Sequence, residues 1–159
     1  MHRDRHAGFT LVELLVVVFL VALLAGLASV SVGDDAQGQL ELADLQVRDA
    51  IAWAQTLARS SRAPMGVVFE PGGDRLAVVD ETGTQVTDPL TRRGYEVDFS
   101  RPNEPRRVSI QAADFGACGT ALIFDAQGWP LAGGTLTLAA GGGLRTLTVD
   151  GATGRVESL

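Results

Sequence analysis

The segment GFTLVELLVVVFLVALLAGLASVSV, residues 8–32, determines how the rest of the chain is organised. Glu13 is the only charged residue in its apolar part, residues 9–32. As a helix this part would be about 36 Å long, which is enough to span the hydrocarbon core of a bilayer. The preceding leader, residues 1–8, contains Arg3 and Arg5. These charges predict a cytoplasmic N-terminus with the remainder of the chain exported.

Three explanations of this segment compete. It is a conventional signal peptide cleaved after the apolar stretch, near the small residues of Gly26-Leu27-Ala28, or a permanent single-span anchor, or a prepilin-type signal cleaved before the stretch. A carboxylate at the centre of a span costs about 2.5–3.5 kcal/mol, and less near its end, where the side chain reaches the interface. A signal or an anchor gains nothing from Glu13. A fibre subunit does, because the carboxylate can meet a partner's positive charge, so we favour the third explanation.

The six residues Gly8-Phe9-Thr10-Leu11-Val12-Glu13 resemble, at every position, the class III signal of type IV pilins and type II secretion pseudopilins. The resemblance implies that prepilin peptidase cleaves after Gly8 and methylates the new N-terminal residue, Phe9. It also implies that Glu13 acts in subunit assembly by neutralising the N-terminal amine of a neighbouring subunit.

A second, amphipathic helix is predicted at about residues 36–62. Gly33-Asp34-Asp35 interrupts the apolar run, and Pro64 ends the helical pattern. Between them, apolar residues recur at steps of three and four: Leu40, Ala43, Val47, Ala50, Ile51, Ala54, Leu57 and Ala58. We therefore expect the membrane helix to continue into an amphipathic helix that lies on a sheet.

The chain beyond Pro64 shows strand and turn signals. Expected strands are 65–70, 75–80, 84–87, 95–99, 107–110, 121–124, 135–139, 144–149 and 154–157. Short turns between neighbouring strands imply an antiparallel sheet. The predicted fold class is α+β and pilin-like, with a long N-terminal helix on a C-terminal sheet. The expected divisions are a leader (1–8), a transmembrane and assembly helix (9–32) and a periplasmic domain (33–159) whose β-rich part covers 65–159.

Two stretches of this domain resemble the GspH/FimT group of minor pilins, which includes type II secretion system protein H. The first is the passage from helix to strand at residues 46–69. The second is the C-terminal pattern of residues 122–128, 144–149 and 153–156, an apolar strand, a turn with Gly, a hairpin and a final Gly-Arg-Val. The middle of the domain, residues 80–117, resembles no family we can name.

The sequence offers few residues of the types that catalysis usually needs. The only histidines are His2 and His6, both in the leader. A mature chain without them has no Ser-His-Asp or Cys-His catalysis and no His-ligated zinc site. Cys118, the one cysteine, cannot form an internal disulfide and is interpreted as a small buried hydrophobe. We expect no enzyme activity and no cofactor.

Carboxylates form the remaining candidate metal ligands. They group at Asp34, Asp35, Glu41 and Asp44, and again at Asp80, Glu81 and Asp88. Either group could offer oxygen ligands to calcium, but neither has the spacing of a calcium loop. Solvated charge is the favoured interpretation, and no metal site is predicted.

The two tryptophans receive different interpretations. Trp53 lies on the apolar side of the amphipathic helix and is expected in the core. Trp129 falls on a predicted turn, so it either folds onto the sheet, which is favoured, or contacts a neighbouring subunit.

Charge disfavours a nucleic-acid partner. The whole chain carries a net charge of −6. Removing the leader takes away two Arg and one Asp, leaving 11 Arg against 18 acidic residues, or −7.

We expect a minor pseudopilin of a type II secretion system, with other pseudopilins as partners. It would be a single-pass protein of the bacterial inner membrane with its C-terminal domain in the periplasm. The alternative is a FimT/FimU-type minor pilin of a type IV pilus, acting in pilus assembly or DNA uptake.

Overall fold

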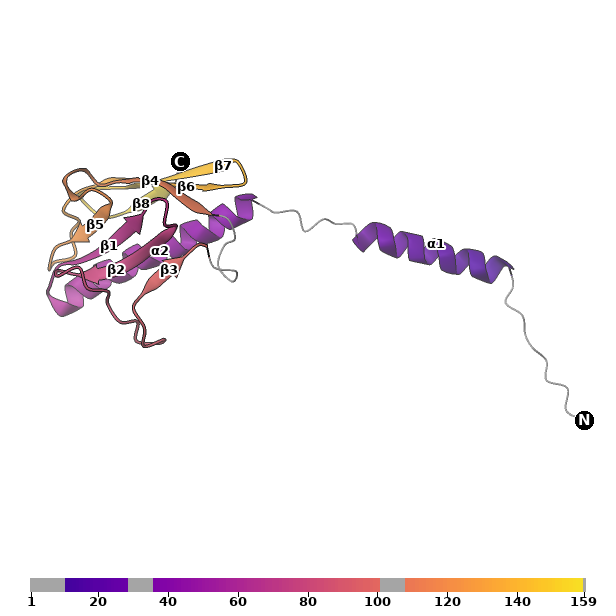
Figure 1. Ribbon diagram of the computed structural model, residues 1–159, viewed down its shortest axis with the longest axis horizontal. Helices are drawn as coiled ribbons and strands as arrows, with labels where there is room; N and C mark the ends of the chain where they lie inside the picture. Colours follow the sequence, from indigo (N-terminus) through magenta and orange to yellow (C-terminus); the bar gives the residue numbers. More distant parts are fainter. Residues whose placement is uncertain (1–10, 29–35, 101–107, 159) are drawn as a thin grey trace, which may run out of the picture. The chain divides into compact units, whose positions relative to one another are not determined.

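The computed structural model describes residues 11–28, 36–100 and 108–158. The chain divides into two compact units, Met1–Asp34 and Asp35–Leu159 (Figure 1). This boundary lies close to the predicted start of the periplasmic domain at residue 33.

The first unit contains a single described helix, α1 (Leu11–Ala28). Apolar residues occupy every face of it, and Glu13 lies in its first turn. The sequence predicted a transmembrane helix over residues 9–32, but its ends at 9–10 and 29–32 lie outside the described residues. Across the described part of the chain, no helix has the length and apolar character that crossing a membrane requires. The 18 residues of α1 are about 27 Å long, slightly short of a typical hydrocarbon core.

The second unit begins with α2 (Ala36–Ser61), which confirms the predicted amphipathic helix. Its buried apolar side chains form the expected stripe: Leu40, Ala43, Val47, Ala50, Ile51, Ala54 and Ala58. Arg62 adopts a positive φ of 55° directly after the helix, which is a common way for a helix to end. The residues joining α1 to α2, 29–35, are outside the described part, so one continuous helix stays a prediction.

The first sheet has the order β3-β2-β1-β5, and all its neighbours are antiparallel. It contains β1 (Met65–Glu70), β2 (Arg75–Asp80), β3 (Glu96–Asp98) and β5 (Ala121–Phe124). The predicted hairpin of 65–70 with 75–80 is confirmed, with Glu70 opposite Arg75.

The second sheet has the order β4-β6-β7-β8 and is also antiparallel. It contains β4 (Ser109–Asp114), β6 (Gly134–Ala140), β7 (Gly143–Val149) and β8 (Val156–Ser158), while the short helix η1 (Gly116–Cys118) lies between β4 and β5. Gly141 and Gly142 join β6 to β7, with φ of 52° and 88°. Two positive φ angles are the requirement of a type I′ turn, which explains a glycine pair at this hairpin tip.

Two expectations about the strands were wrong. Local strand patterns implied one sheet, but the strands form two, because the patterns do not reveal which distant strands become neighbours. The expected strand at 84–87 is absent. Gln85 and Thr87 form only isolated bridges, to Val79 and Gly94. The Asp88 carboxylate folds the following residues into a loop by accepting hydrogen bonds from the Leu90 N–H at 2.9 Å and the Thr91 hydroxyl at 2.8 Å.

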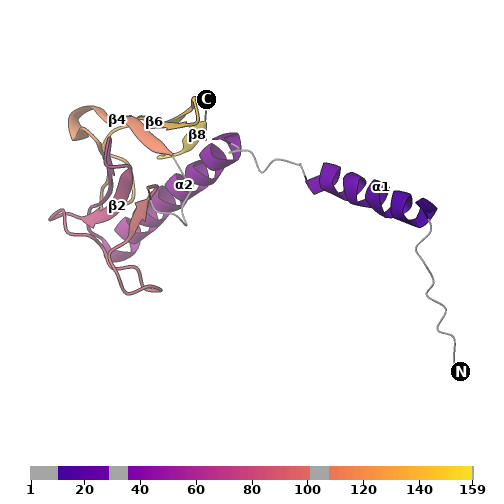
Figure 2. The same cartoon turned by 45° about the vertical axis from the view of Figure 1, so that its right-hand side comes forward.

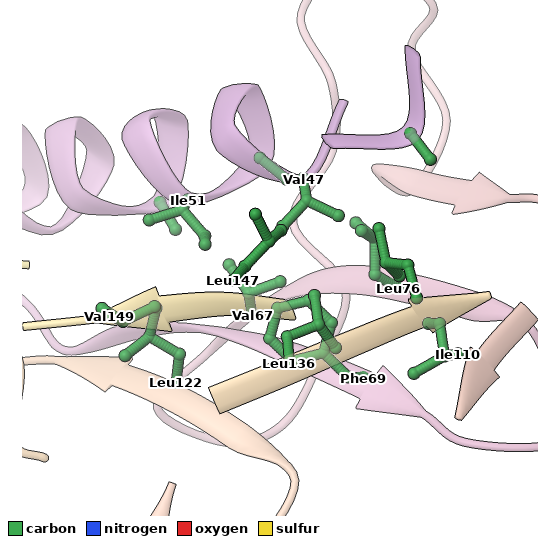
Figure 3. Close-up of a cluster of buried hydrophobic side chains, with 14 of the residues drawn as sticks. Val47, Ile51, Val67, Phe69, Leu76, Ile110, Leu122, Leu136, Leu147 and Val149 are labelled. Carbon is green, nitrogen blue, oxygen red and sulfur yellow. The ribbon is translucent and has the colours of Figure 1, made fainter. Parts of the chain in front are cut away.

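The core lies where α2 meets both sheets, since the helix contacts β1, β2 and β5 of one sheet and β6 and β7 of the other. Figure 2 shows α2 running alongside both. Side chains from all three elements meet in the close-up of Figure 3, which labels Val47, Ile51, Val67, Phe69, Leu76, Ile110, Leu122, Leu136, Leu147 and Val149. The α+β fold class predicted from the sequence is thus confirmed.

Candidate functional site

The N-terminal site residues are only partly described. Gly8 and Phe9, the predicted cleavage and methylation residues, lie outside the described residues. Glu13 lies on α1, where every side chain from 11 to 22 is exposed. An apolar helix with exposed side chains on all its faces must be covered by lipid or by other helices.

A second candidate site is built where α2 ends. Gln55 donates from Nε2 to the backbone oxygens of Gly128 at 2.8 Å and of Thr153 at 3.4 Å. One turn follows β5 of the first sheet, and the other joins β7 to β8 of the second. Arg59 adds a contact from Nε to the Gln127 oxygen at 3.3 Å. The last turns of α2 therefore hold two turns from different sheets together.

Hydrogen bonds within the turn that follows β5 fix its conformation. The Asp125 carboxylate accepts hydrogen bonds from the N–H groups of Gln127 at 2.9 Å and Trp129 at 2.8 Å. The Asp125 N–H in turn donates to the Trp129 oxygen at 2.8 Å. Gly128 has φ of 79°, and a Cβ there would lie 2.4 Å from the Arg59 Nε. The positive φ favours a glycine here, and a Cβ would also require the Arg59 side chain to shift.

Trp129 is presented to solvent by this turn. It is 53% exposed, and Leu131, two residues on, is 60% exposed. Between them Pro130 is buried and bridges to Phe124 of β5. The favoured interpretation, that the sheet buries the Trp129 ring, is wrong. The alternative, a contact with a neighbouring subunit, stays a prediction.

Asp44 is the single buried charged residue among those described, with 7% exposure. Its carboxylate pairs with the Arg48 Nε at 2.6 Å, one turn along α2, and with the Arg145 Nη1 at 3.1 Å, on β7. Arg48 also donates from Nη1 to the Val156 oxygen of β8 at 2.6 Å. This cluster joins the first half of α2 to the second sheet.

The other acidic residues singled out from the sequence do not gather into a ligand set. Asp34 and Asp35 lie outside the described residues, and Glu41 is exposed. The Asp80 carboxylate accepts hydrogen bonds from Thr82 and Thr84 within its own turn. Over the ranges that the structure describes, no group of three or more His, Cys, Asp or Glu is arranged to hold a metal ion.

Hydrogen bonds lower the pKa values of three turn aspartates. The Thr82 hydroxyl, followed by the Thr84 N–H, lowers the pKa of Asp80. The Leu90 N–H, followed by the Thr91 hydroxyl, lowers the pKa of Asp88. At Asp150 the Thr153 hydroxyl and N–H have the same effect on the pKa. In each case donors favour the charged carboxylate, which therefore acts as a turn-forming group.

Cys118 was expected to be buried and Trp53 to lie in the core, but both are only partly buried at the edge of the core. Cys118 is half-buried at the end of η1 and packs against the core. Trp53 is half-buried on α2 and stacks on Tyr95, with ring centroids 4.7 Å apart.

Sequence reasoning missed several residues of these sites. They are Gln55, Arg59, Leu131, Arg48 and Arg145. None of them was singled out from the sequence, because the partners of the four polar residues are distant in sequence or lie in another element. Only the Asp-x-x-Gly pattern of Asp125–Gly128 could have indicated a turn in which an aspartate side chain accepts backbone hydrogen bonds.

Comparison with known proteins adds two findings. A family model described as the prokaryotic N-terminal methylation motif matches residues 3–29, which include Gly8, Phe9 and Glu13. Among solved structures, the type IV minor pilin FimU of Pseudomonas aeruginosa strain PAO1 is similar at 20% identity, with a TM-score of 0.51, over 77% of this chain and 87% of that chain. A second crystal form of FimU gives 17% identity, a TM-score of 0.48, and coverage of 77% and 91%. No curated protein matches the sequence at a significant level.

The chain is type IV pilin-like. The motif and the fold agree, although neither identifies the GspH group in particular. A prepilin-type motif implies that the N-terminal region anchors this pilin-like chain in a membrane. Proteins of this kind are processed by prepilin peptidase and assemble with other pilins into fibres.

Proposed function

We propose that this pilin-like chain is a minor structural subunit of a fibre, and that its role is mechanical rather than catalytic. One observation carries the proposal: a prepilin-type methylation motif stands directly ahead of a domain with a FimU-like arrangement of helix and sheet. The first unit supplies an apolar helix that needs partners, and the second supplies a folded body with its own core.

In this role prepilin peptidase cleaves after Gly8 and methylates the amine of Phe9. The subunit then leaves the inner membrane, and its apolar helix packs among those of other subunits. In such a bundle the Glu13 carboxylate is costly unless it is paired, and the N-terminal ammonium of a neighbour is the matching charge. The second unit lies in the periplasm throughout.

Of the two systems that use such subunits, we favour the pseudopilus of a type II secretion system. The net charge of −7 without the leader opposes a subunit specialised for DNA uptake. The fold likeness to FimU supports the second candidate, a minor pilin of a type IV pilus.

Intact-mass analysis of the membrane-extracted chain tests the processing step. We expect the mass of residues 9–159 plus about 14 Da for one methyl group. A chain that starts near residue 29 would show a conventional signal peptide, and an uncleaved chain would show a plain anchor. Either result overturns the proposal.

Deletion of the gene in its own host separates the two systems. Loss of protein secretion with normal surface pili supports the pseudopilus. Loss of pili with normal secretion supports the type IV pilus.

A further inference from the structure

Large exposed apolar side chains lie near both ends of α2. At its C-terminal end are Trp129 and Leu131, which follow the turn that the exposed Arg59 contacts at the Gln127 oxygen. We call Trp129, Leu131 and Arg59 the C-terminal surface. On the first half of the helix, Glu41, Leu42, Leu45 and Asp49 are all exposed and follow the spacing of one helix face. We call these four residues the N-terminal surface.

The two surfaces are chemically complementary. Each offers two exposed apolar side chains, between 53% and 60% exposed. The C-terminal surface adds the cation of Arg59, and the N-terminal surface adds the two carboxylates of Glu41 and Asp49. Contacts with an apolar centre and opposite charges at the rim are the usual composition of a specific interface.

The C-terminal surface is also prepared for binding. Hydrogen bonds on both sides of Trp129 fix its backbone, and Arg59 is held against the Gln127 oxygen. A tryptophan whose backbone is already fixed loses less conformational entropy on binding, which suits an interface anchor.

The two surfaces cannot meet within one molecule. Arg59 lies fourteen residues after Leu45 on the same helix, which separates them by about 21 Å along its axis. A contact between unlike surfaces therefore needs a second molecule. It repeats head to tail instead of closing into a symmetric dimer.

We propose that the C-terminal surface binds the N-terminal surface of a second copy of this chain. The inference rests on the proposed function, since a fibre brings successive subunits together along one axis. It goes beyond that function by naming the two surfaces and by making self-stacking a property of this subunit. Trp129 is the anchor of the contact, and Arg59 pairs with the carboxylates of the next copy.

The test is a crosslink between two differently tagged full-length chains in one membrane. Both carry Cys118→Ala. One carries Gln127→Cys beside the C-terminal surface, and the other carries Gln37→Cys beside the N-terminal surface. We expect a mixed dimer with a short thiol crosslinker. Moving the second cysteine to Gln111, which is exposed on β4, should abolish it.

Substitutions then test which residues make the contact. Trp129→Ala should lower the yield of mixed dimer at least about tenfold, because it removes the anchor. Leu90→Ala, which alters a leucine that is 92% exposed and lies outside both surfaces, should leave the yield unchanged. Arg59→Glu should lower it several-fold, and Glu41→Arg in the other copy should restore it. Arg93→Glu is the control for the change in charge.

Three results overturn the inference: no mixed dimer, equal yields with Gln111→Cys, or crosslinks from position 127 to other fibre subunits alone. Leader cleavage and co-purification with the fibre are measured on the same membranes. A processed, fibre-associated chain without the mixed dimer refutes self-stacking and leaves the proposed function standing. An unprocessed chain refutes the proposed function, and the dimer is still scored.

Discussion

The two helices of this chain differ in where their stability comes from. Helix α1 is apolar on every face, so its stabilising partners are lipid or other helices. Helix α2 has a single apolar stripe, which two sheets of the same chain cover. One chain therefore combines a helix that depends on lipid or other helices for its stability with a domain that is stabilised by its own core.

This contrast predicts that substitutions in the two units affect different properties of the protein. A change in the core of the second unit should alter the free energy of unfolding and leave leader processing alone. A change in α1 should leave that free energy unchanged and instead affect membrane insertion or fibre assembly. The predictions below follow in order of their expected effect on the unfolding free energy of the second unit.

The largest effect is expected for Phe69→Ala. Phe69 is 1% exposed and stacks on Phe115, with ring centroids 5.6 Å apart. Truncation leaves a cavity in the core and should cost about 3–5 kcal/mol. Denaturant unfolding of the detergent-solubilised full chain, followed by tryptophan fluorescence, measures it.

Phe19→Ala in α1 is the matched control. Phe19 is 63% exposed, and we expect no change in the unfolding of the second unit. Equal losses for both phenylalanines would break the contrast between the helices.

A smaller effect is expected for Asp44→Ala. It leaves Arg48 and Arg145 without the carboxylate that they share. Breaking a fully buried pair costs about 3–5 kcal/mol. Both arginines are partly exposed, so we expect about 2–3 kcal/mol, measured by denaturant unfolding.

Asp49→Ala removes an exposed carboxylate from the same helix and should change stability by less than about 0.5 kcal/mol. If both variants unfold alike, the Asp44 cluster does not hold α2 to the second sheet.

The elements predicted well from the sequence are those with strong local signals. The stripe from Leu40 to Ala54 follows the helix period, and Pro64 ends it, so α2 was placed to within a residue of its end. The strands β1, β2 and β5 are bounded by Gly, Pro or Asp and were placed with the observed limits.

The elements that were missed depend on contacts between distant residues. Pairing of β4 with β6 instead of β3 divides the strands into two sheets, and nothing local to Ser109–Asp114 encodes that choice. The hydrogen bonds from Gln55 to the Gly128 and Thr153 oxygens span 73 and 98 residues. Exposure of Trp129 depends on where α2 places its turn, so the type of residue alone favoured burial.

Acid should destabilise the second unit only mildly. The pKa values of Asp80, Asp88 and Asp150 are lowered by their turn hydrogen bonds from the ordinary value of 3.8. A carboxyl whose folded pKa is lowered contributes stability above its unfolded pKa and loses it as the pH falls through the folded pKa. We expect constant stability above about pH 5 and a decline below about pH 4, measured by denaturant midpoints.

Thr153→Val and Thr82→Val should each flatten part of this decline, because each removes a donor to one carboxylate. Since the two turns are separate, the double variant should show the sum of the single effects. An unchanged pH profile would show that these turns contribute nothing to acid sensitivity.

No effect on unfolding is expected for Glu13→Ala, and this variant tests the contrast most directly. Glu13 lies in the first turn of α1, so its loss should leave the unfolding free energy of the second unit unchanged. The helix becomes more apolar, so membrane insertion should be equal or better, and Gly8 is intact, so cleavage should continue. Incorporation into the fibre should fall, because the carboxylate no longer meets a neighbour's N-terminal ammonium. Comparing crosslinks to partner subunits for the variant and the wild type measures this.

Glu13→Gln separates charge from polarity, because glutamine retains hydrogen bonding but carries no charge. We expect it to assemble as poorly as the alanine variant. Normal assembly of Glu13→Gln would show that a hydrogen bond suffices, and normal assembly of Glu13→Ala would remove Glu13 from the mechanism.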